Sequence, residues 1–231
     1  MPSNCEAWHP IPFFGPIETA SAVTVAMNPS ADEVRGRKWP DTLTTEALTG
    51  RLVGYFEHPV GPHPWFDASE RPLRGLGLRY GHNLAHLDLV CRATRTIGRA
   101  ESSDFLALAD GEAGLFFGAL NAATKLRLVV LSGSITNARY AHEHLARHAT
   151  QAGWTFSPRP MRVPGGPFAA RHELCRGDRR VAVLFTSASV NKRGGSEPYE
   201  RLVLAHRDWL GVRLGPGSRN VPSTSSAQRG T

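Results

Sequence analysis

Four short runs of apolar residues, many of them β-branched, recur along the chain. Each run has the length of a strand and is almost continuously hydrophobic, a pattern typical of strands buried on both faces of a parallel sheet. Because parallel strands need long crossover connections, the segments between the runs are expected to supply helices. The predicted strands are Ser21–Met27, Leu84–Val90, Leu126–Leu131 and Val181–Phe185.

Two of the connecting segments have a helical pattern. Phe105–Ala122 predicts one or two helices before the third strand, and Arg139–Gln151 predicts a helix after it that Gly153 ends. The turn-like residues from Arg176 to Arg179 indicate a local hairpin before the fourth strand, which would make the sheet partly mixed. The pattern as a whole predicts an α/β fold with three α/β/α layers and a central, mainly parallel four-stranded sheet.

Two other segments lack a clear hydrophobic period. Val34–Arg79 is rich in Pro, Gly, His and Trp, and we expect irregular surface structure there. Gly215–Thr231 consists mostly of Gly, Ser, Pro and polar residues, which favours a disordered tail. The length of 231 residues fits a single domain, which we place at residues 1–214.

Charge and cysteine content narrow the classes of function. The chain has 27 Lys and Arg against 20 Asp and Glu, a formal net charge of +7 that favours a polyanionic partner such as nucleic acid. Its three cysteines are widely spaced, so they indicate neither a disulfide framework nor a zinc or iron–sulfur site. No secretory leader or bilayer-spanning apolar run is recognisable, and we expect a cytoplasmic monomer without membrane contact.

The residues just after the predicted strands are the candidates for chemistry, because ligands of open parallel sheets bind beyond the carboxyl ends of the strands. Each of these segments also has a plain structural explanation. Asn-Pro is a common turn, Ser-Gly-Ser often starts a helix, and Ser-Ala-Ser is an ordinary loop. The strand-end segments are Met27–Ser30, Asp88–Val90, Ser132–Ser134 and Ser187–Arg193.

In their order and placement, these segments resemble the motifs of the uracil-DNA glycosylase superfamily. Ala26-Met27-Asn28-Pro29-Ser30 is similar to the Gly-Met-Asn-Pro-Gly motif of the single-strand-selective and mismatch-specific branches. The strand His86–Val90 stands where the family has its base-reading Asn, and Leu131–Ser134 is similar to a Leu-Trp-Gly-Ser segment. Val183–Ser189 falls where the family has His-Pro-Ser and an intercalating loop. The resemblance covers about residues 20–195 through short motifs and implies a uracil-DNA glycosylase-like fold.

The resemblance also implies roles for individual residues in flipping a nucleotide out of DNA and hydrolysing its glycosidic bond. Asn28 would place the attacking water, and Ser187 would stand at the position of the catalytic His. The base-binding candidates are Met27, Ser30, Trp39 and Asp88, with Phe13, Phe14, Trp65 and Phe66 as weaker candidates for ring stacking. The DNA-binding candidates are Ser134, Ser189, Asn191, Lys192 and Arg193.

Two departures from the family pattern bear on the substrate. Ser187 in place of His is a weaker, neutral donor, so base departure would be slower or differently assisted. Asp88 in place of Asn accepts hydrogen bonds and cannot donate to a carbonyl, which suits the 4-amino group of cytosine better than O4 of uracil. Strict uracil enzymes block C5 with a Tyr where this chain has Ser30.

Together these features favour a bulky 5-modified cytosine, such as glucosylated hydroxymethylcytosine in phage DNA, as the preferred substrate. Several alternatives stay open. The chain could act on uracil or mismatched thymine, or it could be a non-catalytic module that binds modified DNA, and Asp88 could instead form an ion pair with Arg92 or Arg95.

A histidine-rich helix segment is the remaining candidate for a metal site. His144 and His148 have the spacing that places two metal ligands on one helix face, but a solvated basic face is the preferred interpretation, so no metal site is predicted. Strand one is followed by no Gly-rich phosphate loop, and no cofactor is expected.

Overall fold

The computed structural model describes residues 10–29, 43–93, 103–156, 168–190 and 196–215. Its strands are β1 Ala22–Ala26, β2 Leu84–Asp88, β3 Leu128–Ser132, β4 Thr155–Phe156, β5 Ala169–Arg176 and β6 Arg179–Thr186. Its α-helices are α2 Thr45–Val53, α3 Pro64–Glu70, α4 Ser103–Ala122, α5 Ile135–His148, α6 Glu197–Leu204 and α7 Arg207–Leu214. Four short 3₁₀ helices are η1 Ile17–Thr19, η2 Tyr55–Glu57, η3 Arg71–Leu76 and η4 Thr150–Ala152.

The strands form one mixed sheet in the order β2-β1-β3-β6-β5-β4. All four predicted strands are present as β1, β2, β3 and β6, and they pair in parallel. The predicted hairpin is also present, because β5 pairs antiparallel with β6 around a turn where Gly177 has a φ of +55°. The prediction of a four-stranded sheet was wrong in number: the described residues form a sheet of six strands, since β5 and the two-residue β4 extend it beyond β6.

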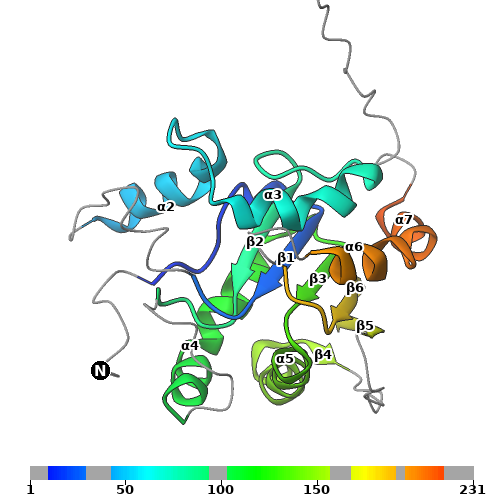
Figure 1. The fold of residues 1–231 in the computed structure, drawn as a ribbon. Helices are drawn as coiled ribbons and strands as arrows, with labels where there is room; N and C mark the ends of the chain where they lie inside the picture. The colour runs from blue at the N-terminus through cyan, green and yellow to red at the C-terminus, as the bar shows by residue number, and fades with distance from the viewer. Residues whose placement is uncertain (1–9, 30–42, 94–102, 157–167, 191–195, 216–231) are drawn as a thin grey trace, which may run out of the picture.

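Helices cover both faces of this sheet (Figure 1). On one face, α4 and α5 pack against alternate strand residues such as Val25, Leu87 and Leu131. On the other face, α2, α3, α6 and α7 pack against the intervening residues, among them Leu84 and Leu184. This double coverage explains why the predicted strands are continuously apolar: a strand buried on both faces has no polar side to alternate with. Among the described residues, no helix has the length and apolarity required to cross a bilayer.

The expectation of irregular structure across Val34–Arg79 was wrong for its described part. Residues 43–79 contain α2, α3 and two 3₁₀ helices that cover one face of the sheet. Their starts have ordinary helix chemistry, because the Thr44 hydroxyl accepts a hydrogen bond from Ala47 N and Pro64 occupies the first turn of α3. The helices are short and rich in turn residues, so their hydrophobic period was too weak to be recognised. Residues 30–42, and all of the predicted tail except Gly215, lie outside the described residues.

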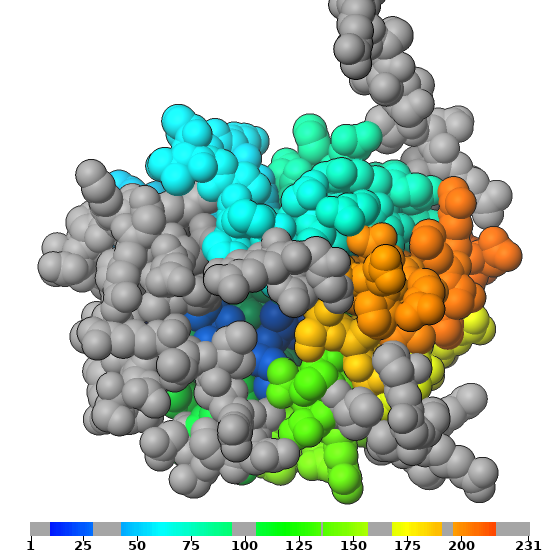
Figure 2. All heavy atoms as spheres, viewed as in Figure 1, coloured from blue at the N-terminus to red at the C-terminus, as the bar shows by residue number. Residues whose placement is uncertain are grey.

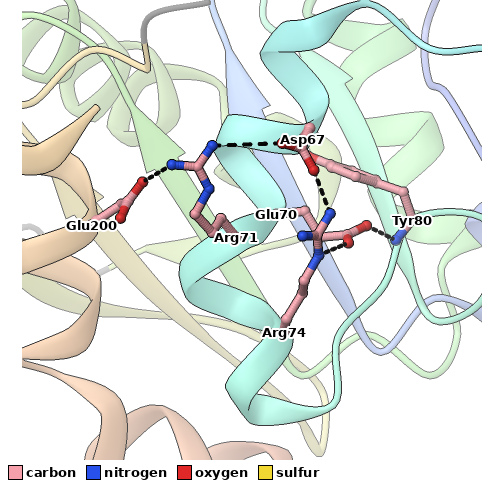
Figure 3. Close-up of polar contacts among 6 residues, drawn as sticks. All are labelled: Asp67, Glu70, Arg71, Arg74, Tyr80 and Glu200. Atoms are coloured by element: carbon pink, nitrogen blue, oxygen red, sulfur yellow. Dashed lines mark hydrogen bonds and ion pairs between the residues drawn. The ribbon is translucent and has the colours of Figure 1, made fainter. Parts of the chain in front are cut away.

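A group of charged side chains fastens α3 and η3 to their surroundings (Figure 3). The Glu70 carboxylate accepts hydrogen bonds from Arg74 Nε at 2.6 Å and from the buried backbone N–H of Tyr80 at 2.7 Å. Arg71 reaches across to Glu200 of α6 at 3.0 Å. Arg74 also donates to Asp67, and this hydrogen bond holds the pKa of the Asp67 carboxyl below its usual range. The group therefore joins α3, η3, the chain before β2 and α6.

Candidate active site

Four parallel strands bring their carboxyl ends to one edge of the sheet. Ala26 of β1 is in register with Asp88 of β2, and Ser132 of β3 is in register with Thr186 of β6. Figure 2 shows this edge as a hollow in which the dark blue segment around β1 is recessed between the green start of α5 and the yellow-orange chain after β6. The strand-end residues are thus neighbours in space, although they are far apart in the sequence.

Asn28 lies two residues after the end of β1 and is partly buried. Its chain is fixed against β2, because Leu89 N donates to Ala26 O at 3.1 Å and Val90 N donates to Met27 O at 2.9 Å. The Asn28 side chain donates from Nδ2 to the carbonyl of Pro29 at 3.0 Å. The amide therefore stabilises the Asn-Pro turn and stands beside the end of β2.

Asp88 closes β2 with a side chain that is only 2% exposed. Within the described part of the chain, neither of its carboxylate oxygens accepts a hydrogen bond. The nearest cationic candidate is His86, whose Nε2 lies 3.4 Å from Asp88 Oδ2. Arg92 does not pair with Asp88, because its Nε donates to Glu112 at 2.7 Å, and Arg95 lies outside the described residues.

A buried polar chain runs from Asp88 into the interior and was not predicted from the sequence. His86 Nδ1 lies 2.8 Å from the Thr24 hydroxyl, which in turn lies 2.5 Å from the Tyr80 hydroxyl. The Tyr80 hydroxyl in turn donates to Ser69 Oγ at 3.3 Å, so these polar contacts continue from the sheet to α3. These contacts therefore fix the orientation of the His86 ring beside Asp88.

Aromatic rings enclose His86 on the same face of the sheet. The ring centroids of Trp65 and Phe66 lie 4.8 and 5.2 Å from that of His86, and Phe14 lies at 5.9 Å. Three of the weaker stacking candidates thus surround the residue next to Asp88 on its face of β2. Trp39, the preferred stacking candidate, and Ser30 lie outside the described residues.

Ser187 is buried at the end of β6, and its hydroxyl has a backbone partner. Ser187 Oγ accepts a hydrogen bond from Phe168 N at 2.7 Å, while Ser187 N donates to Phe168 O at 2.9 Å. This pair of bonds fastens the end of β6 to the chain just before β5. Met27, a base-binding candidate, is 5% exposed and belongs to the core beneath α4 and α5.

The Ser-Gly-Ser segment forms the entry to α5. Ser134 is the N-cap, and its hydroxyl accepts a hydrogen bond from Asn137 N at 3.2 Å. A Cβ at Gly133 would lie 2.7 Å from the Cβ of Asn137, so the close approach requires glycine. Ser189 is exposed beyond β6, whereas Asn191, Lys192 and Arg193 lie outside the described residues.

The expectation of a solvated histidine face on α5 was wrong. The side chain of His144 is fully buried and that of His148 is 10% exposed. Burial lowers the pKa of His144 to about 4, with the neighbouring His148 adding to the effect. These histidines face α4, where Asp110 meets them.

Sequence comparisons with known proteins identify no family for this chain. Neither the family models nor the curated protein sequences that we searched match the chain. The glycosylase resemblance therefore depends on the strand-end motifs of the chain itself.

Proposed function

We propose that this protein is a monofunctional DNA glycosylase of the uracil-DNA glycosylase superfamily that removes a modified pyrimidine and leaves an abasic site. The single observation that carries the proposal is the buried Asp88 carboxylate at the same sheet edge as Asn28, because within the described residues it accepts no hydrogen bond. A desolvated carboxylate is costly unless a donor reaches it. A flipped base that offers an amino group is such a donor.

The chemistry of Asp88 favours cytosine among the pyrimidines. Its carboxylate accepts hydrogen bonds, so it pairs with the 4-amino group of cytosine and repels O4 of uracil. The side-chain contacts of His86 with Thr24 and of Thr24 with Tyr80 hold the surroundings of Asp88 rigid. A rigid pocket accepts only a base with the matching pattern of donors and acceptors. We propose a bulky 5-modified cytosine, of which glucosylated hydroxymethylcytosine in phage DNA is the example, as the preferred substrate.

Asn28 would act by positioning. Departure of the base leaves a sugar with oxocarbenium character, and a water held at the anomeric carbon completes hydrolysis. An amide oxygen orients this water without removing its proton, so the rate gain comes from placement and the intrinsic rate is modest. The Asn28 amide is already fixed by its bond to Pro29 O, which limits its rotation at the end of β1.

The DNA backbone would bind around the same edge. The formal net charge of +7 supports attraction to phosphate. The start of α5 at Ser134 offers backbone N–H groups to an anion, and the exposed Ser189 stands on the neighbouring strand end. Asn191, Lys192 and Arg193 would extend this contact as the loop that enters the base stack.

The test is a glycosylase assay on duplexes that contain uracil, mismatched thymine or glucosylated hydroxymethylcytosine, with cleavage of abasic sites as the readout. We expect product from the modified cytosine with the natural chain and at least a tenfold loss of rate with Asn28→Ala. Val212→Ala, a change at an exposed residue of α7 that has no part in the proposed site, serves as the control. Absence of abasic product from all three duplexes would refute the proposed glycosylase activity.

One observation favours a second candidate, a non-catalytic module that binds modified DNA. The Ser187 hydroxyl, at the position where the family has its catalytic His, is engaged by Phe168 N. Such a module would bind the modified duplex more tightly than the plain duplex and release no base. Binding measurements on the duplexes of the assay distinguish the two candidates.

A further inference from the structure

A cluster of two imidazoles and a carboxylate lies between α4 and α5. His144 and His148 are one turn apart on α5, and both face Asp110 of α4. His148 Nε2 lies 2.7 Å from Asp110 Oδ1, and His144 Nδ1 lies 3.8 Å from the same oxygen. One ligand atom from each residue can be chosen so that all three lie within 4.8 Å of one another. From this cluster we propose that Asp110, His144 and His148 bind a divalent transition-metal ion, with Zn²⁺ as the best-suited member of that class.

The contacts of His144 support the proposal, since they are too weak for a fully buried ring. Its Nδ1 lies 3.4 Å from the Tyr140 hydroxyl, at the long limit of a hydrogen bond. Its Nε2 is buried and has no hydrogen-bond partner among the described residues. Buried polar atoms normally have good partners, and a metal ion at Nδ1 would replace the long contact with Tyr140 by a strong interaction, while Nε2 would keep its surroundings.

The donor set selects the class of metal. Two imidazole nitrogens with one carboxylate oxygen suit Zn²⁺ and its transition-metal neighbours, whereas Mg²⁺ and Ca²⁺ prefer oxygen ligands alone. Three protein ligands leave one position of a tetrahedral ion for water. A pocket of about 230 Å³ borders His148 next to the cluster and is lined by Gly114, Phe117 and Gln151.

Arg147 is the competitor of the ion. Its Nη1 lies 3.1 Å from both oxygens of Asp110 and balances the carboxylate charge. The two side chains are 53% and 40% exposed, and ion pairs this exposed contribute little to stability. A metal ion can therefore enter from solvent and displace the guanidinium at small cost.

The position of the cluster gives the ion a structural task. α5 begins at the carboxyl end of β3 and runs back, so its last turns lie away from the strand-end site. An ion there would join α4 to α5, the two helices that cover one face of the sheet (Figure 1). The proposal is thus independent of the glycosylase proposal.

The experiment is calorimetric titration of the full, metal-free chain with Zn²⁺, together with thermal unfolding in the presence and absence of the ion. We expect one equivalent to bind and to raise the unfolding temperature, because a ligand that binds only the folded state stabilises it. Mg²⁺ should do neither. Failure to bind one equivalent, or the same binding of Mg²⁺, would overturn the proposal.

Three variants locate the ion. His148→Gln and Asp110→Asn should each weaken Zn²⁺ binding by about tenfold or more, and circular dichroism of both variants checks that they fold. Arg147→Gln removes the competitor and should tighten binding. His142→Gln, a change on the same helix but outside the cluster, is the matched control and should leave binding unaltered. Equal affinity of all variants would show that the ion binds elsewhere.

Discussion

Asp88 and His86 occupy alternate positions of β2, so they share one face of a strand that is otherwise apolar. The glycosylase proposal gives this pair a measurable consequence. Asp88→Asn replaces an acceptor by a group that can also donate, so preference should move from the modified cytosine towards uracil. Because a correct base contact contributes about 1–3 kcal/mol, the ratio of the two rates should change by about 5- to 150-fold. The check is the same assay with competing duplexes; an unchanged ratio would remove Asp88 from base recognition.

Glu70 holds a different part of the molecule, and its two oxygens have separate partners. Glu70→Ala leaves the buried N–H of Tyr80 without its acceptor and should lower the free energy of unfolding by about 1–3 kcal/mol. Glu70→Gln keeps one carbonyl oxygen for Tyr80 N and should cost less. Asp67→Asn removes an ion pair of the same group at a side chain that is 56% exposed, and should change stability by less than about 1 kcal/mol. Urea denaturation measures all three variants, and equal effects of Glu70→Ala and Asp67→Asn would contradict the assignment.

At the scale of elements, two glycines in open space have opposite expected effects. A Cβ would meet nothing within 4 Å at Gly111 in α4 or at Gly177 in the β5–β6 turn, but only Gly177 has a positive φ, of +55°. Gly111→Ala should stabilise the protein by about 0.5–1 kcal/mol, because alanine loses less entropy in a helix. Gly177→Ala should destabilise it by about 1–2 kcal/mol, because an L side chain is strained in the left-handed region. Thermal unfolding of the two variants is the measurement, and shifts of the same sign would be inconsistent with these backbone conformations.

The elements also show which parts of the fold could be predicted from the sequence. The four parallel strands were predictable because burial on both faces leaves long apolar runs. The helix α4 was predictable from its recurring apolar residues, and the hairpin from its turn residues. The two-residue β4 and the short α2 and α3 were not, because their patterns are too brief to stand out from their Pro- and Gly-rich surroundings. These elements depend on tertiary packing for their stability.

In the candidate site, too, the features that strand ends mark in the sequence could be predicted, and those that depend on packing could not. Asn28 and Asp88 could be placed at one sheet edge because strand ends are visible in the sequence. The bond between Thr24 and His86 could not, since it depends on the register of β1 against β2, which single strands do not encode. The only hint of this contact in the sequence was that His86 and Asp88, two residues apart, interrupt an otherwise apolar strand. The contact of Asp110 with the α5 histidines likewise depends on how two helices pack.

At the scale of the whole molecule, burial of two tyrosines between the sheet and its helices predicts sensitivity to alkali. Burial raises the pKa of Tyr80 and Tyr199 far above the ordinary 10.0, and their hydroxyls are hydrogen-bonded to Thr24 and to Ser69 O. Above pH 10 the unfolded chain releases these protons while the folded chain keeps them. The folded state then binds more protons than the unfolded state, so stability must fall as pH rises, by about 1.4 kcal/mol per pH unit for each tyrosine.

The measurement is the free energy of unfolding against pH, with phenolate absorbance and circular dichroism recorded on the same samples. Phenolate from these two residues should form only as the fold is lost. Tyr80→Phe and Tyr199→Phe should each make the alkaline slope shallower, whatever they do to stability at neutral pH, because each removes one proton from the linkage. The Tyr80 hydroxyl contacts Thr24 in the sheet and Ser69 in α3, and the Tyr199 hydroxyl donates to Ser69 O. A full phenolate signal from a natively folded protein would therefore mean that the space between the sheet and α3 is open to water.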